Sequence, residues 1–139
     1  MKFIALSLAA VFSFLAGLHI YWGLGGRWAS ESALPRTTGG ELVFKPGLLG
    51  CLVVAGGLGG FAYLCLAHAA LLPRPAMLAN THRFLAGMSV IFALRVVGDF
   101  RYVGVFRRIK ETDFAVRDRS IYTPLCAVLS AVLALLAAA

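Results

Sequence analysis

The stretch from Ile121 to Ala139, IYTPLCAVLSAVLALLAAA, contains no charged side chain. An α-helix needs roughly 20 predominantly apolar residues to cross the hydrocarbon core of a bilayer, and this stretch is long enough. Pro124 falls in the first turn of such a helix, where its missing N–H removes no intrahelical hydrogen bond. The stretch therefore predicts a membrane-spanning helix.

Three further apolar runs lie upstream, at about residues 3–24, 47–72 and 84–106. In lipid the backbone must satisfy its own hydrogen bonds, so these runs predict helices. The alternating ten-residue segments of a transmembrane β-barrel are absent. We interpret residues 3–24 as an uncleaved span rather than a signal peptide, because the apolar run is longer than a usual signal core. The predicted fold is all-α: a four-helix transmembrane bundle with antiparallel neighbours and a long first connection, forming a single integral membrane domain over residues 1–139.

The composition supports the same class. Hydrophobic residues make up 60% of the chain, charged residues only 14%, and the mean hydropathy is +0.86. A soluble domain typically carries about 25% charged residues to cover its surface. The net charge of +7 comes mostly from Lys and Arg between the apolar runs, so we expect no nucleic-acid partner. Three cysteines, all inside apolar runs, argue against a disulfide framework.

The basic side chains predict an orientation. The connections at residues 25–46 and 107–120 together hold eight Lys and Arg side chains, against three on the opposite side. By the positive-inside rule, these two longer connections face the cytoplasm and both termini face outward. Arginines that bind a ligand would weaken this prediction.

The third apolar run contains three charged side chains, Arg95, Asp99 and Arg101. Arg95 lies close to mid-membrane at a helical rise of about 1.5 Å per residue. Asp99 and Tyr102 follow at i+4 and i+7, so they share one helical stripe with Arg95. Ionisable side chains at such depth are costly and by default indicate a functional site. An alternative stays open, because Arg95 and Asp99 could form an ion pair that only locks the bundle.

The end of the first run supplies possible partners for that stripe. His19 and Trp22 lie on one helical face, and this end is on the same side of the membrane as Asp99 and Tyr102 because successive spans are antiparallel. Trp22 could instead belong to the aromatic belt at the membrane interface. The resulting ligand-binding candidates are His19, Trp22, Arg95, Asp99, Arg101 and Tyr102.

Metal and haem chemistry find no support in the sequence. His19 lies roughly 24 Å along its helix from the terminal side, whereas His68 lies only about 6 Å from that side, so the two cannot share one iron. The spacings HxxxH, HExxH and CxxC are absent. We therefore expect no metal and no cofactor, and we identify no catalytic residue.

Glycines are frequent in the second run. Gly57-x-Gly59 superficially resembles a dinucleotide-binding motif, but the strand that this motif requires is missing. Gly56 and Gly60 are better interpreted as a small-residue ridge for close helix packing. The ridge could seat a neighbouring helix of this chain, or a second copy or another membrane protein.

Several blocks together carry a family resemblance: His19-Ile20-Tyr21-Trp22-Gly23-Leu24-Gly25-Gly26 with Trp28 and Ala33-Leu34-Pro35, then Gly98-Asp99-Phe100-Arg101-Tyr102-Val103-Gly104, and Tyr122-Thr123-Pro124-Leu125-Cys126. The chain resembles a family of small bacterial four-span integral membrane proteins classed as a domain of unknown function. The resemblance covers nearly the whole chain and implies a four-helix fold in the bacterial inner membrane. It implies no activity, cofactor or catalytic residue.

Three functions are compatible with these observations. The leading hypothesis is a non-enzymatic protein that binds a membrane lipid or another anionic amphipathic ligand at the polar cluster, because arginines form strong bidentate hydrogen bonds with phosphate or carboxylate. One alternative is an intramembrane isomerase or reductase acting on a lipid or quinone, with His19 as general acid or base. The other is a structural subunit of a larger membrane complex.

Overall fold

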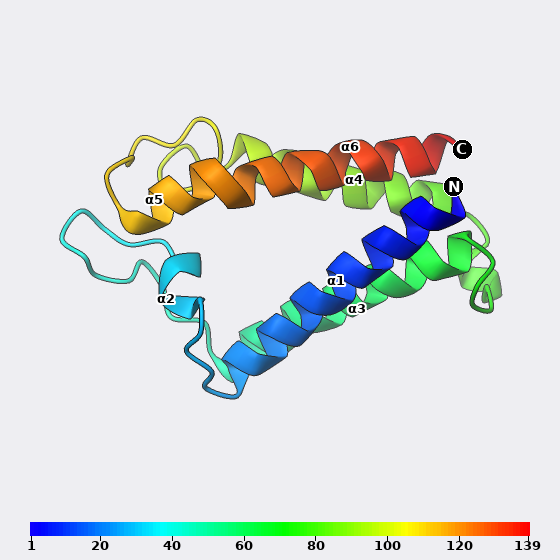
Figure 1. Cartoon of the computed structure of the whole chain (residues 1–139), viewed down its shortest axis with the longest axis horizontal. Coiled ribbons are helices and arrows are strands. Elements are labelled where there is room, and N and C mark those ends of the chain that lie inside the picture. Colours follow the sequence, from blue (N-terminus) through cyan, green and yellow to red (C-terminus); the bar gives the residue numbers. More distant parts are fainter.

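The computed structural model describes all of residues 1–139 and is built from helices. The long helices are α1 (Lys2–Gly23), α3 (Leu48–His68), α4 (Thr81–Val97) and α6 (Thr123–Ala138). The short elements are α2 (Ser30–Ala33), the 3₁₀ turn η1 (Ala76–Leu78), α5 (Asp113–Arg117) and the π-helical turn η2 (Asp118–Tyr122). The four long helices pack antiparallel, so the predicted all-α fold and its long first connection are confirmed (Figure 1).

The long helices form two pairs, α1 with α3 and α4 with α6. Figure 1 shows the two pairs close together at the end that holds both termini and diverging toward the end that holds α2 and α5. Between the pairs, Phe12 of α1 packs against Phe61 of α3 and Phe92 of α4, with ring centroids 5.7 Å apart in each case. The aromatic cluster therefore joins the pairs before they separate.

The α1–α3 contact follows from the spacing of small side chains. On α3 the buried residues recur at helical intervals of four and three: Cys51, Ala55, Leu58, Ala62 and Cys65. Small residues at such an interface let two backbones approach closely, which favours helix association in lipid. The pairing of α1 with α3 in the structure thus agrees with the spacing of small buried residues on α3.

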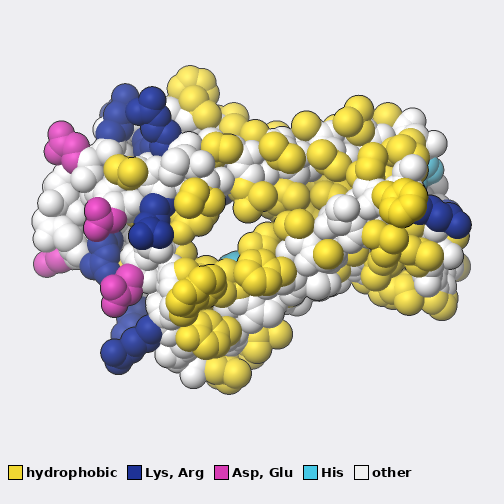
Figure 2. All heavy atoms as spheres, in the orientation of Figure 1, with side chains coloured by type: hydrophobic (Ala, Val, Ile, Leu, Met, Phe, Trp, Pro, Cys, Tyr) yellow, Lys and Arg dark blue, Asp and Glu magenta, His cyan; other side chains and the backbone are white.

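Three helical segments are long and apolar enough to span a membrane: α1, α3 and the continuous helical stretch from Asp113 to Ala138 that comprises α5, η2 and α6. Figure 2 shows hydrophobic side chains over most of the long helices, with the Asp and Glu side chains in view and most of the Lys and Arg gathered at the end that holds α2 and α5. The chain is therefore a multi-pass membrane protein.

Two predicted helix ends are wrong. The third helix ends at Val97 and not near Phe106, because Gly98 adopts a left-handed conformation with φ of 87°, which interrupts the helix. At 17 residues, α4 is shorter than the roughly 20 residues of a perpendicular span. The last helical stretch starts at Asp113, upstream of the predicted Ile121, because Thr112 caps it by accepting a hydrogen bond from the Ala115 N–H at 3.2 Å.

The glycine ridge of α3 faces away from the rest of the chain. Gly56, Gly57, Gly59 and Gly60 are exposed, and a Cβ built at any of them would meet nothing within 4 Å. The ridge does not seat another helix of this chain. A partner helix at this face stays a prediction.

Candidate functional site

The first part of the candidate site is a closed loop that follows α4. Asp99 Oδ1 accepts hydrogen bonds from the backbone N–H groups of Arg101, Tyr102 and Val103 at 2.7–2.9 Å. The loop closes where the Val105 N–H donates to the Val96 carbonyl at 2.8 Å. Partial burial raises the pKa of Asp99, but the N–H donors of Val103, Arg101 and Tyr102 together outweigh it and hold the pKa below its usual range. Asp99 is therefore the organiser of this turn.

Two glycines make this loop possible. Gly98 and Gly104 have φ of 87° and 85°, and their backbones are in contact. A Cβ at Gly98 would lie 1.8 Å from the Val103 carbonyl oxygen, and one at Gly104 would lie 2.5 Å from the Val97 carbonyl oxygen. We name residues 98–104 the glycine-bounded loop. It directs the Gly104 N–H toward Asp118.

Asp118 is the centre of the site. Its side chain is fully buried and accepts hydrogen bonds from Arg95 Nη2 at 2.6 Å and Arg107 Nη1 at 2.7 Å. The Gly104 N–H and the Thr123 hydroxyl each donate to Oδ2 at 3.0 Å. A buried carboxylate is stable only when it is paired and hydrogen-bonded, and these contacts supply both conditions. The cluster joins α4, the glycine-bounded loop and the start of α6.

The π-helical turn η2 positions this carboxylate. Buried residues of α6 recur at Leu129, Leu133 and Leu136, with intervals of four and three. Upstream, Asp118 and Thr123 are both buried although they are five residues apart. A π-turn adds a residue to the helical turn, so it keeps both side chains on the inner face, and such turns often mark functional sites.

A cavity of about 480 Å³ opens between the two helix pairs, next to Arg95. Its walls are mostly apolar, from α1, the α2 segment, α4 and α6, and among them are Phe14, Leu18, Ala33, Phe92 and Leu125. Its polar lining residues are His19 and Arg95, and Trp22 also lines it. In Figure 2 the molecule is hollowed between the two pairs, close to its charged end.

The cavity brings together three of the predicted residues. His19 Nδ1 lies 2.8 Å from the Leu15 carbonyl oxygen, and the His19 ring packs edge-on against Trp22, with centroids 5.1 Å apart. Trp22 Nε1 donates to the Trp28 carbonyl at 2.8 Å, which ties the first connection to α1. Arg95 is about one-third exposed, and its Nη1 is buried without a hydrogen-bond partner.

The other three predicted residues lie in the glycine-bounded loop and do not line this cavity. Arg101 is exposed, with its guanidinium 5.2 Å from the centre of the Tyr102 ring. The possible Arg95–Asp99 ion pair is not formed, because α4 ends before Asp99 and the Asp99 carboxylate binds backbone N–H groups instead. Arg95 pairs with Asp118, which is distant in sequence.

Sequence reasoning missed Asp118, Arg107, Gly104 and Thr123, the residues that complete the cluster. Asp118 lies in the connection at residues 107–120, between Arg117 and Arg119. A signal was present: Phe114, Ala115 and Asp118 share a helical face that leads into the final apolar run.

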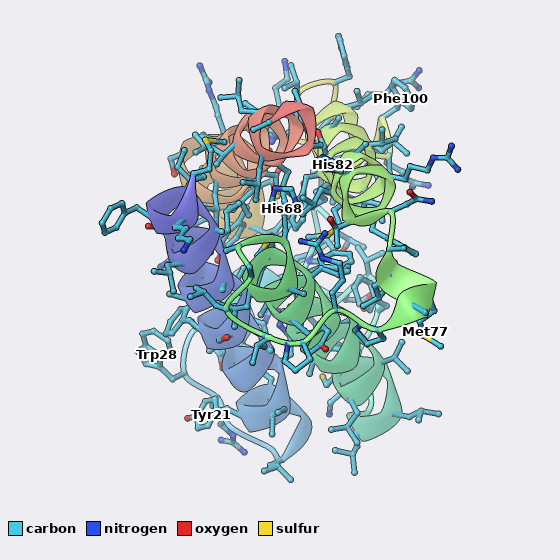
Figure 3. The ribbon with its side chains drawn as sticks, turned by 90° about the vertical axis from the view of Figure 1, so that its right-hand side faces the viewer. Tyr21, Trp28, His68, Met77, His82 and Phe100 are labelled. Atoms are coloured by element: carbon cyan, nitrogen blue, oxygen red, sulfur yellow. The ribbon has the colours of Figure 1, made fainter.

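The opposite end of the bundle holds two histidines. His68 and His82 lie close together in Figure 3, with ring centroids 5.0 Å apart. His68 Nδ1 lies 3.1 Å from the Thr81 hydroxyl, and His82 Nδ1 lies 3.0 Å from the Ala137 carbonyl oxygen. No group of three or more metal-ligating side chains is present. These contacts tie together the helix ends near the termini.

Residues 12–133 match the family described as Protein of unknown function (DUF3995). The chain belongs to this family. The match covers α1 from Phe12 onward, α3, α4, α6 as far as Leu133 and the whole Asp118 cluster of this DUF3995 protein, and the predicted family resemblance is confirmed. Comparison with curated proteins and with solved structures finds no match.

Proposed function

We propose that this DUF3995 protein binds an anionic amphipathic molecule, a membrane lipid or a lipid-like compound, in the cavity between its helix pairs. The anionic group contacts Arg95, and the apolar part lies along the cavity walls. His19 and Trp22 line the same space and contact the polar part of the ligand. The observation that carries the proposal is the buried Arg95 Nη1, which has no hydrogen-bond partner and belongs to a residue that lines the cavity.

The charge balance of the cluster supports an anionic ligand. Asp118 supplies one negative charge to two guanidinium groups, those of Arg95 and Arg107, so the cluster retains one positive charge. An uncompensated charge at this depth is expensive, and a buried N–H donor without a partner costs about 1–3 kcal/mol. A ligand carboxylate or phosphate at Arg95 would supply both the missing charge and the missing acceptor.

The shape and lining of the cavity support an amphipathic ligand. A volume of about 480 Å³ is suited to one small ligand, since binding pockets span roughly 300–1,000 Å³. Of its 15 lining residues, 13 are hydrophobic, and Arg95 supplies the charge. An acyl or isoprenoid chain fits such walls, whereas a fully polar solute would leave them unsatisfied.

Native mass spectrometry of the protein released from native-membrane nanodiscs tests the proposal. We expect a bound anionic amphipathic molecule on the wild type and at least about tenfold weaker binding in Arg95→Gln, because a charge-assisted hydrogen bond contributes about 1.5–3 kcal/mol. This variant leaves a neutral Asp118–Arg107 pair, so the fold is retained. Arg101→Gln is the matched control, because it removes one exposed charge outside the cavity. Bare protein at 14.8 kDa, or equal binding by both variants, would contradict the proposal.

We infer the orientation from the charge distribution. The protein lies in a bacterial inner membrane with α2, α5 and the glycine-bounded loop on the cytoplasmic side, where positive charge gathers. Single cysteines introduced at Thr38 and at Met77 in a variant without native cysteines test this. We expect a membrane-impermeant maleimide applied outside intact cells to label the cysteine at 77 and not the one at 38. The reverse pattern would overturn the orientation.

A further inference from the structure

A second pocket lies on the other side of the Asp118 cluster. It has a volume of about 640 Å³, and its lining includes Arg107, Lys110, Arg119, Ser120 and Thr123. The lining contains three cationic side chains and no acidic one. None of the residues that line this pocket lines the cavity at Arg95. The two spaces are therefore separate, and Asp118 connects them by pairing with Arg95 through Oδ1 and with Arg107 through Oδ2.

Arg107 is the buried anchor of this pocket. Its side chain is 6% exposed and is held by a single hydrogen bond, from Nη1 to Asp118. The other N–H groups of its guanidinium have no acceptor in the protein. A guanidinium presents several donors in a rigid planar fork that matches the oxygens of a phosphate group. Arg107 is thus fixed in place and still has donors for a ligand.

Lys110 and Arg119 reach the pocket from different segments. Lys110 follows Arg107 in the connection, whereas Arg119 belongs to the turn η2, directly after Asp118. Neither side chain makes a hydrogen bond or ion pair within the protein, and both are exposed. Like charges that converge without an acidic partner repel one another, so their placement around one pocket favours an anion between them.

Exposed apolar side chains border the same pocket. Val105 and Val116 line it and are 57% and 60% exposed, and the neighbouring Phe106 is 60% exposed and stacks on Phe100. Apolar side chains beside basic ones are typical of protein surfaces that lie in the lipid headgroup region. At the charged end of the molecule in Figure 2, Lys and Arg side chains lie next to exposed hydrophobic ones.

We propose that Arg107, Lys110 and Arg119 form a second site, which binds a phosphate group. The phosphate belongs to a phospholipid headgroup or is free in solution. Arg107 donates its unpaired N–H groups to the phosphate oxygens, and Lys110 and Arg119 close on them from the outside. The site does not depend on the ligand proposed for the cavity at Arg95.

The test compares two double variants of the full chain in detergent. Lys110→Gln/Arg119→Gln removes two exposed charges from the pocket. Arg27→Gln/Lys45→Gln is the matched control, because it removes one Arg and one Lys that are exposed at the same end of the molecule and make no side-chain hydrogen bond. Binding of dioleoylphosphatidylglycerol is measured by native mass spectrometry, and binding of inorganic phosphate by isothermal titration calorimetry. Unchanged thermal unfolding confirms that both variants are folded.

We expect binding to weaken at least about tenfold in the pocket variant and to stay within about fivefold of the wild type in the control. Loss confined to phosphatidylglycerol identifies a lipid headgroup, and loss of inorganic phosphate binding identifies a free phosphate. Equal weakening in both double variants, or no weakening in either, overturns the proposal. Arg95→Gln should leave this binding intact, so the proposals for the second site and for the cavity can be contradicted independently.

Discussion

Among the glycines, Gly98 leaves the least room for an added Cβ. A Cβ there would collide with the Val103 carbonyl oxygen, and φ of 87° is strained for any L side chain. We expect Gly98→Ala to lower the free energy of unfolding by about 3 kcal/mol or more. Gly17→Ala is the control, because the site has open space and lies within α1. Thermal unfolding in detergent measures both; an equally stable Gly98→Ala protein would contradict the loop geometry.

Asp118 is buried and paired with two arginines, whereas Asp113, five residues earlier, is exposed and forms no ion pair, so the two make a useful comparison. In Asp118→Asn, Arg95 and Arg107 lose their only carboxylate while staying largely buried, so we expect a loss of about 3–5 kcal/mol in the free energy of unfolding. Asp113→Asn removes an exposed charge from α5 and should change it by less than about 1 kcal/mol. Chemical denaturation in detergent distinguishes the two, and equal stability would show that the cluster is dispensable.

Asp99 predicts a dependence on pH. Its pKa is lower in the folded loop than in the unfolded chain, so its contribution to stability is present above the unfolded value and is lost as pH falls through the folded one. At neutral pH we expect Asp99→Ala to cost about 1 kcal/mol, as for other side chains that cap backbone N–H groups. The difference from wild type should shrink below about pH 4. Unfolding measured at pH 7 and pH 3 checks this, and a constant difference would be inconsistent with it.

Among the elements, the helices themselves could be predicted and two of their ends could not. The apolar runs are helices because lipid leaves the backbone no other partner, and that argument needs only composition and length. The end of α4 depends on Gly98, and a glycine within an apolar run is equally compatible with a continuing helix. The start of the last helical stretch depends on the cap at Thr112.

The residues of the candidate site could likewise be predicted only in part. His19, Trp22 and Arg95 could be predicted from depth and helical face, and the structure places all three around one cavity. The partner of Arg95 could not be predicted. Asp118 is 23 residues away in the sequence, and it is positioned by a π-helical turn that the α-helical periodicity of the sequence does not reveal. Asp99, the predicted ion-pair partner that is closer to Arg95 in sequence, lies beyond the end of α4.

Because the glycines of α3 are exposed, we predict that they serve association with a partner and not the fold of the single chain. Replacing Gly60 with Leu adds a side chain into open space, so we expect the fold of one chain to be retained and its thermal unfolding to be unchanged or slightly raised. If a second copy or another membrane protein packs on this face, the same change should reduce the mass of the assembly in size-exclusion chromatography. Gly17→Leu on α1 is the control. A wild-type protein that is already a single chain would rule out self-association through this face.

In the whole molecule, the two helix pairs meet at the terminal end and part at the charged end, and residues of both pairs line the cavity. Cys126 lines the cavity and is half-buried, whereas the other two cysteines, Cys51 and Cys65, are buried. We expect a small hydrophobic maleimide to add once per chain, at Cys126, in protein stripped of lipid. Because an amphipathic ligand would cover Cys126, the adduct should form more slowly in protein with its native lipid, and Arg95→Gln should remove that protection. Intact-mass and peptide mass spectrometry follow the reaction, with Cys126→Ser as the control. Labelling that ignores both lipid and Arg95 would show that the space between the pairs is not where the ligand binds.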